Sequence, residues 1–143
     1  MDRFFTALFE LHPIHSMTVH FPIALTAVAL LFLVLALWRR SEALERAAFY
    51  NISLAAVSTL VTGITGIRDN LVRFDGAATN ANVKLFLGVS LFLLTTVTAL
   101  SRRRRPEILW TPATTVLYIG AYAASFVLAA TLGFLGGVIL YGY

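Results

Sequence analysis

The sequence predicts an all-α integral membrane protein, a four-helix bundle with a short N-terminal interfacial helix. Of the 143 residues, 59% are hydrophobic and only 13% are charged, and the mean hydropathy is +0.82. These values lie well outside the range of soluble domains. Four apolar stretches are each long enough to cross a hydrocarbon core of about 30 Å, which takes roughly 20 helical residues. The short connections between them predict that successive helices are antiparallel neighbours.

The elements follow one another without space for a soluble domain, so we expect a single membrane domain over residues 1–143. An interfacial helix is expected at 2–12, because phenylalanine, leucine and histidine recur there at helical spacing. A disordered tail is the alternative for this segment. The membrane-spanning helices are predicted at about 17–38, 44–67, 82–101 and 112–140. Ser41 is a suitable N-cap for the second helix, and Thr111 followed by Pro112 for the fourth.

The positive charges predict the orientation. The connections after the first and third spans contain seven arginines, whereas the opposite side has fewer basic residues, which aspartate and glutamate partly offset. By the positive-inside rule the seven-arginine side faces the cytoplasm. We therefore expect a multi-pass protein of the bacterial inner (cytoplasmic) membrane with both termini on the periplasmic side. The seven are Arg39, Arg40, Arg46 and Arg102 to Arg105.

Composition also excludes several classes of function. Cysteine is absent, which excludes disulfides, thiolate metal sites, iron–sulfur clusters and covalently attached haem. Nucleic acid is not indicated by the net charge of +4, since the arginines cluster in short connections between apolar runs. No nucleophile–base–orienter set is evident, so no catalytic residue is predicted and an enzyme is disfavoured. A transporter or channel component is a weaker alternative, because no charged residue falls in the middle third of any span.

All three histidines lie at the head of the first span, and they form the strongest candidate site. Pro22 lacks a backbone N–H, so it should bend or restart the helix and leave carbonyls near Thr18 without partners. Polar side chains beside such a break at membrane depth indicate function. We therefore predict that a metal or a haem b is held through His15 or His20, with His12 assisting. The alternative is that they bond loop carbonyls and lipid head groups.

Helical geometry limits this histidine site. His12 is about 60° from His15 and about 80° from His20 around a regular helix, whereas His15 and His20 diverge by about 140°. One helix cannot place two imidazoles on opposite faces of a haem. A bis-histidine haem therefore needs a second protomer, a partner subunit or a different second ligand. The candidates for that ligand within this chain are Met17, Lys84 and Tyr141.

Two further regions are candidates for weaker reasons. At the outer end of the second span, Arg68 and Asp69 suit an interfacial ion pair, and Lys84 can extend to the same surface. This region is either a solvated loop or a site for an anionic group such as haem propionates or a lipid head group. In the fourth span, small residues at four-residue intervals favour close helix packing over a cofactor edge. They form two series, first Gly120 and Ala124 and then Ala129, Gly133 and Gly137.

These motifs resemble those of a bacterial and archaeal family of four-helix integral membrane proteins known only as a domain of unknown function. The opening motif is His12-Pro-x-His15-x-Met-x-Val-His20-Phe-Pro, and Arg68-Asp69 follows a glycine-rich end of the second span. The chain closes with Gly133-x-x-Gly-Gly-x-x-x-Tyr141. Members are sometimes fused to or encoded beside Rieske-type and cytochrome components. The resemblance spans nearly the whole chain and implies a redox-associated membrane protein.

The chain departs from the family pattern at three places. Ser16 stands where many members have proline, and Val138 stands where a polar residue is often found after the double glycine. At the start of the third span, where many members have a histidine, the chain offers Asn80, Asn82 and Lys84. These departures argue against a bis-histidine haem held by this chain alone.

Together the residues and the resemblance predict a small membrane subunit of a respiratory or photosynthetic electron-transfer complex. We expect it to carry a haem b or a metal near the periplasmic face through the histidines of the first span. The expected partners are membrane lipids and either other membrane subunits of such a complex or a second copy in a homodimer. The alternative is a structural or assembly subunit without a cofactor.

Overall fold

The computed structural model describes residues 14–78 and 80–141, apart from the side chains of 73, 74 and 138–141. In this part of the chain every regular element is a helix. The helices are α2 (Ile14–Thr18), α3 (His20–Arg39), α4 (Glu42–Phe74), α5 (Ala81–Arg104) and α6 (Pro112–Tyr141). Four helical segments are long and apolar enough to cross a membrane: Ile14–Arg39, Glu42–Val72, Ala81–Arg104 and Pro112–Gly137. The predicted all-α membrane bundle is confirmed. The interfacial helix proposed at 2–12 lies outside the described residues.

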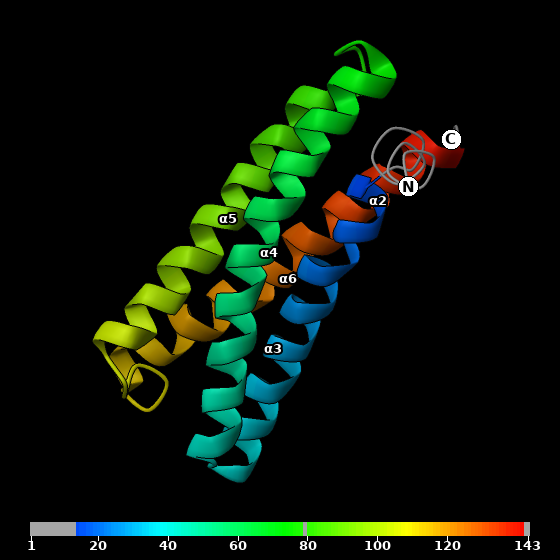
Figure 1. Ribbon diagram of the computed structural model, residues 1–143. Coiled ribbons are helices and arrows are strands. Elements are labelled where there is room, and N and C mark those ends of the chain that lie inside the picture. Colours follow the sequence, from blue (N-terminus) through cyan, green and yellow to red (C-terminus); the bar gives the residue numbers. More distant parts are fainter. Residues whose placement is uncertain (1–13, 79, 142–143) are drawn as a thin grey trace, which may run out of the picture.

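The four long helices form a closed ring. Consecutive helices pack against each other, and α6 returns to contact α3 (Figure 1). The α3–α4 turn and the α5–α6 connection lie at one end of the bundle. We call this the basic end, because Arg39, Arg40, Arg46 and Arg102 to Arg105 gather there. At the other end, the histidine end, α2 packs against α4 and carries His15.

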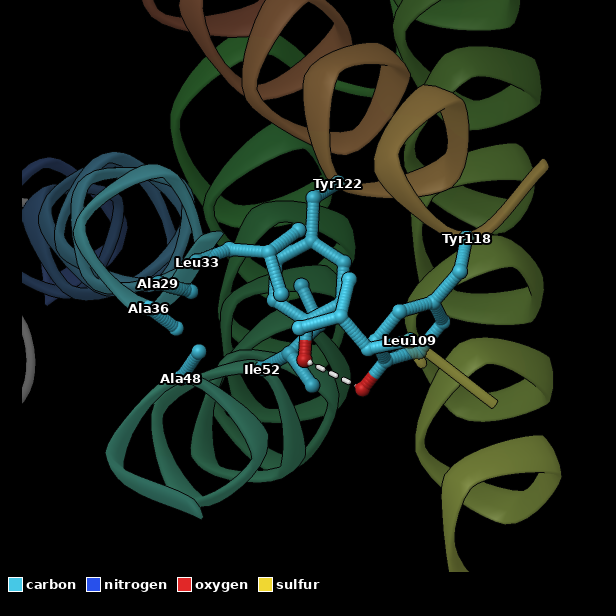
Figure 2. Packing of buried hydrophobic residues seen from close by; sticks show 8 residues of the cluster. All are labelled: Ala29, Leu33, Ala36, Ala48, Ile52, Leu109, Tyr118 and Tyr122. Atoms are coloured by element: carbon cyan, nitrogen blue, oxygen red, sulfur yellow. Dashed lines mark hydrogen bonds between the residues drawn. The ribbon is translucent and has the colours of Figure 1, made fainter. Parts of the chain in front are cut away.

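The core near the basic end combines small and large side chains. Ala29 and Ala36 of α3 and Ala48 of α4 are fully buried, which lets the two backbones approach closely (Figure 2). Lipid tails are as apolar as leucine, so helices in a membrane associate through such close packing and through hydrogen bonds. Larger side chains complete the cluster: Leu33, Ile52, Leu109, Tyr118 and Tyr122.

The helix α4 is 33 residues long, or about 50 Å at 1.5 Å per residue, so its ends extend beyond a hydrocarbon core of about 30 Å. Ser41 precedes its first residue and is its N-cap, as predicted: the Ser41 hydroxyl accepts a hydrogen bond from the Leu44 N–H at 3.4 Å. The helix continues to Phe74 because polar residues past residue 67 are tolerated outside the hydrocarbon. The left-handed backbone at Asp75 and Gly76 then ends it.

Pro112 and Thr111 set the start of α6. Pro112 is the first residue of the helix, as expected for a residue without an N–H. The Thr111 hydroxyl donates to the Glu107 carbonyl at 3.0 Å. The Thr111 carbonyl accepts the N–H groups of Thr114 at 2.9 Å and Thr115 at 3.0 Å, which begins the hydrogen bonding of α6.

Candidate functional site

His15 lies in the seam between α2 and α4. Its Nδ1 is 3.0 Å from the carbonyl oxygen of Thr62. A carbonyl oxygen only accepts hydrogen bonds, so Nδ1 carries the proton in the neutral ring and Nε2 keeps a free lone pair. The ring lies against Gly66, where an added Cβ would be 2.9 Å from Cε1 of the imidazole. Glycine at this position is therefore what lets the ring approach α4.

Asp69 fixes the start of α2. It is buried, with 5% of its surface exposed. Its Oδ2 accepts the backbone N–H of His15 at 3.1 Å, and its Oδ1 accepts Nη1 of Arg68 at 2.8 Å. The first N–H groups of a helix have no partner within the helix and carry partial positive charge. The Asp69 carboxylate thus caps α2 from the neighbouring helix.

A set of threonines satisfies the break before Pro22. Because proline has no N–H, the carbonyl of Thr18 loses the partner that an unbroken helix would give it. The structure ends α2 at Thr18 and starts α3 at His20, and the Thr62 hydroxyl donates to the Thr18 carbonyl at 3.1 Å. The Thr18 and Thr65 hydroxyls are 2.9 Å apart. The Thr18 carbonyl, predicted to lose its partner in the helix, therefore accepts a hydrogen bond from α4 instead.

The structure brings some of the predicted site residues together and separates others. His15 and Arg68 meet through Asp69, and Lys84 lies near enough to His15 for their charges to interact. Met17, by contrast, is 60% exposed, and His20 is also exposed. His12 and the side chain of Tyr141 lie outside the described residues. Within the described part of the chain, no three His, Asp or Glu side chains are grouped as a metal site.

The basic end contains a second buried polar cluster. Glu45 of α4 is 1% exposed. It accepts two hydrogen bonds from Arg102 of α5, with Nε to Oε1 at 2.5 Å and Nη2 to Oε2 at 2.6 Å. The Tyr118 hydroxyl donates to Oε1 at 3.5 Å and lies 3.0 Å from that of Tyr122 (Figure 2). Three helices are thus joined around one carboxylate, with the paired geometry that favours arginine.

A family of membrane proteins matches the chain over residues from both ends of the bundle. The family model described as "Predicted membrane protein (DUF2231)" matches residues 11–143. The chain belongs to this family. The membership agrees with the resemblance to an uncharacterised family of membrane proteins. No curated protein and no solved structure matches the chain.

The Glu45 cluster of this DUF2231 protein is not among the sites predicted from the sequence. As one of four consecutive arginines, Arg102 indicates topology, and Glu45 has no predicted role. A helical pattern was nevertheless present. Counting from Glu45, steps of three and four residues reach Ala48, Ile52, Ala55 and Thr59, all of which are buried. Steps of four, three and four connect Tyr118, Tyr122, Ser125 and Ala129, which are also buried.

The two clusters offer different chemistry. At the histidine end, Nε2 of His15 can act as a ligand to iron or another metal, and Lys84 supplies a positive charge at the same end. The residues fit one side of a haem site, because His15 packs against α4 whereas the side chains of Met17 and His20 are exposed. At the basic end, the polar groups of Glu45, Arg102, Tyr118 and Tyr122 all have partners within the cluster.

Proposed function

We propose that this DUF2231 protein is a small membrane subunit of a respiratory or photosynthetic electron-transfer complex in which His15 provides one axial ligand to a haem b. The hydrogen bond from Nδ1 to the Thr62 carbonyl carries this proposal. Histidines that ligate metals usually donate their other ring N–H to a carbonyl or carboxylate, which fixes the tautomer and the ring orientation. The haem would supply the one-electron chemistry, and His15 would orient it at the histidine end.

Lys84 gives the proposal a second support. The ammonium group is half-buried and makes no hydrogen bond or ion pair with the described residues. A desolvated positive charge without a partner favours a nearby anion. A haem propionate would provide one, and Arg68, whose side chain is 34% exposed, adds a second positive charge at this end.

The second axial ligand would come from another protomer or a partner subunit. His15 is the only histidine of the described chain that packs in the α2–α4 seam. The exposed side chains of Met17 and His20 are suited to face a neighbouring copy. With the seven arginines of the basic end in the cytoplasm, the histidine end would receive electrons from a periplasmic donor.

The test is the optical spectrum of the protein purified from haem-replete cells. We expect a Soret band that shifts on reduction. It should disappear in His15→Ala and also in Gly66→Ala, because the added Cβ at position 66 would collide with the imidazole ring of His15. Gly63→Ala is the matched control, because nothing lies within 4 Å of its added Cβ. A protein that stays colourless after incubation with excess haem would contradict the proposal. So would a Soret band that persists in His15→Ala.

A structural or assembly subunit without a cofactor is the second candidate. It is supported by the closed hydrogen-bond network of the α2–α4 seam, in which the His15 N–H and the Thr18 carbonyl both have partners. This candidate predicts a colourless protein that co-purifies with other membrane subunits. It also predicts that His15→Ala lowers thermal stability and loosens that association.

A further inference from the structure

Two adjoining cavities open at the basic end. One has a volume of about 310 Å³ and the other about 470 Å³, the size of sites that bind small ligands, which begin at roughly 300 Å³. Glu42 and Trp110 line both cavities, so the two meet at these residues. The smaller is otherwise lined by Glu45, Arg46, Arg102, Pro106 and Glu107. The larger is otherwise lined by Leu37, Arg40 and Leu109.

The charges that line these cavities balance. Three are arginines and three are glutamates. Glu45 and Arg102 pair with each other; the Glu45 side chain is buried at 1% exposed, and that of Arg102 is 16% exposed. The other four are exposed, and their charged groups make no ion pair or hydrogen bond with the described residues: Arg40, Arg46, Glu42 and Glu107. A lining with two free charges of each sign does not favour a ligand of net charge, but it suits one with separated charges of both signs.

The cavities lie at the level of lipid head groups. Trp38 and Trp110 are exposed at this end of the bundle, and indoles concentrate at the boundary between hydrocarbon and head groups. Leu37 and Leu109 line the larger cavity beside Arg40, whereas the smaller cavity is lined mainly by charged side chains. Polarity thus increases from the larger cavity to the smaller, as it does from the glycerol of a phospholipid to the end of its head group.

We propose that the two cavities bind the head group of phosphatidylethanolamine. The phosphate would pair with the guanidinium groups of Arg40 and Arg46, and the primary ammonium would donate to the carboxylates of Glu42 and Glu107. Guanidinium groups bind phosphate with geometric specificity, and an ammonium has three N–H donors. Choline has no N–H donor for the carboxylates. The head group of phosphatidylglycerol has no cation for them.

The test is lipid binding measured by native mass spectrometry of the detergent-solubilised protein. Phosphatidylethanolamine, phosphatidylcholine and phosphatidylglycerol with identical acyl chains are offered in equal amounts. The wild type should retain phosphatidylethanolamine about tenfold better than either other lipid, as expected when one charge-assisted contact is lost. The double variant Glu42→Gln, Glu107→Gln should lose this preference. Both residues are exposed, so helix content measured by circular dichroism should not change.

Arg103→Gln is the matched control, because Arg103 is exposed at the same end and lines neither cavity. This variant should keep the preference. Equal retention of the three lipids by the wild type would overturn the proposal. Preferential retention of phosphatidylglycerol, or a preference that survives in the double glutamate variant, would overturn it as well. These outcomes do not depend on the haem proposal, since they concern the other end of the bundle.

Discussion

The histidine end and the basic end each contain a buried α4 carboxylate bonded to an arginine, but the two ion pairs do different work. Asp69 pairs with the adjacent Arg68 on the same helix and uses its second oxygen to cap α2. Glu45 binds Arg102 of α5 through both oxygens and contacts Tyr118 of α6. One carboxylate therefore completes a broken helix, and the other connects three helices.

The burial and the partner of each carboxylate, rather than the mere presence of an ion pair, set its contribution to stability. Arg68 is partly exposed, so water solvates part of its charge. Its ion pair with Asp69 therefore contributes little to stability, as is usual for exposed ion pairs. The Arg102 side chain is only 16% exposed, so the loss of Glu45 would leave a largely desolvated charge without its partner. The basic end should be the more sensitive end to loss of its carboxylate.

The largest expected effect is that of Glu45→Ala. Removing one partner of a buried ion pair costs about 3–5 kcal/mol, and we expect a loss of about 3 kcal/mol here. The measurement is the free energy of unfolding in a dodecyl sulfate titration followed by circular dichroism. Glu42→Ala is the control, because Glu42 lies in the same turn of α4 but is exposed. If the two variants had the same free energy of unfolding, burial would not determine how much a carboxylate contributes to stability, and the prediction would be wrong.

Asp69→Ala should have a smaller effect. It removes the cap of α2, which is worth about 1–2 kcal/mol, while Arg68 turns to solvent. The same titration measures the change, and amide hydrogen exchange should increase at His15. Asp75→Asn serves as the control at this end, since Asp75 is exposed and asparagine tolerates its left-handed backbone. If Asp69→Ala lowered the free energy of unfolding as much as Glu45→Ala, the basic end would not be the more sensitive end.

The smallest effect is expected for Thr62→Val. This change keeps the shape of the side chain and removes the donor to the Thr18 carbonyl, at a cost of about 1 kcal/mol. Thr26→Val is the matched control, because the Thr26 hydroxyl donates to the Pro22 and Ile23 carbonyls of its own helix. Unfolding free energies should rank Thr62→Val below Thr26→Val. The reverse order would mean that the Pro22 break is satisfied by something other than α4.

Local patterns in the sequence predicted the bundle well. Apolar length predicted the four spans, and Pro22 predicted the break and the free carbonyl of Thr18. These features depend on residues within one turn of each other, where helical geometry is fixed. The partners of His15 were not predictable in this way, because Thr62 and Asp69 are 47 and 54 positions away in the sequence. Which face of α4 meets α2 is decided by packing between helices.

The missed cluster at the basic end has a different cause. The seven arginines strongly indicate the topology. Because that role already accounts for Arg102, the sequence suggests no second role for it. An arginine at the end of a span can mark the membrane boundary and also pair with a buried carboxylate. The burial of Glu45 distinguishes these roles, and it depends on how α4, α5 and α6 meet around it.

The placement of these partners has a consequence for membrane insertion. The Thr18 carbonyl freed by Pro22, the His15 backbone N–H and the His15 ring all have their partners on α4, so the hairpin from α2 to α4 is the shortest piece of chain that satisfies them. Glu45 belongs to the same hairpin, yet its partner Arg102 emerges from the ribosome only at the end of the third span. During synthesis the two ends of the bundle therefore close at different times, the histidine end first and the basic end after it.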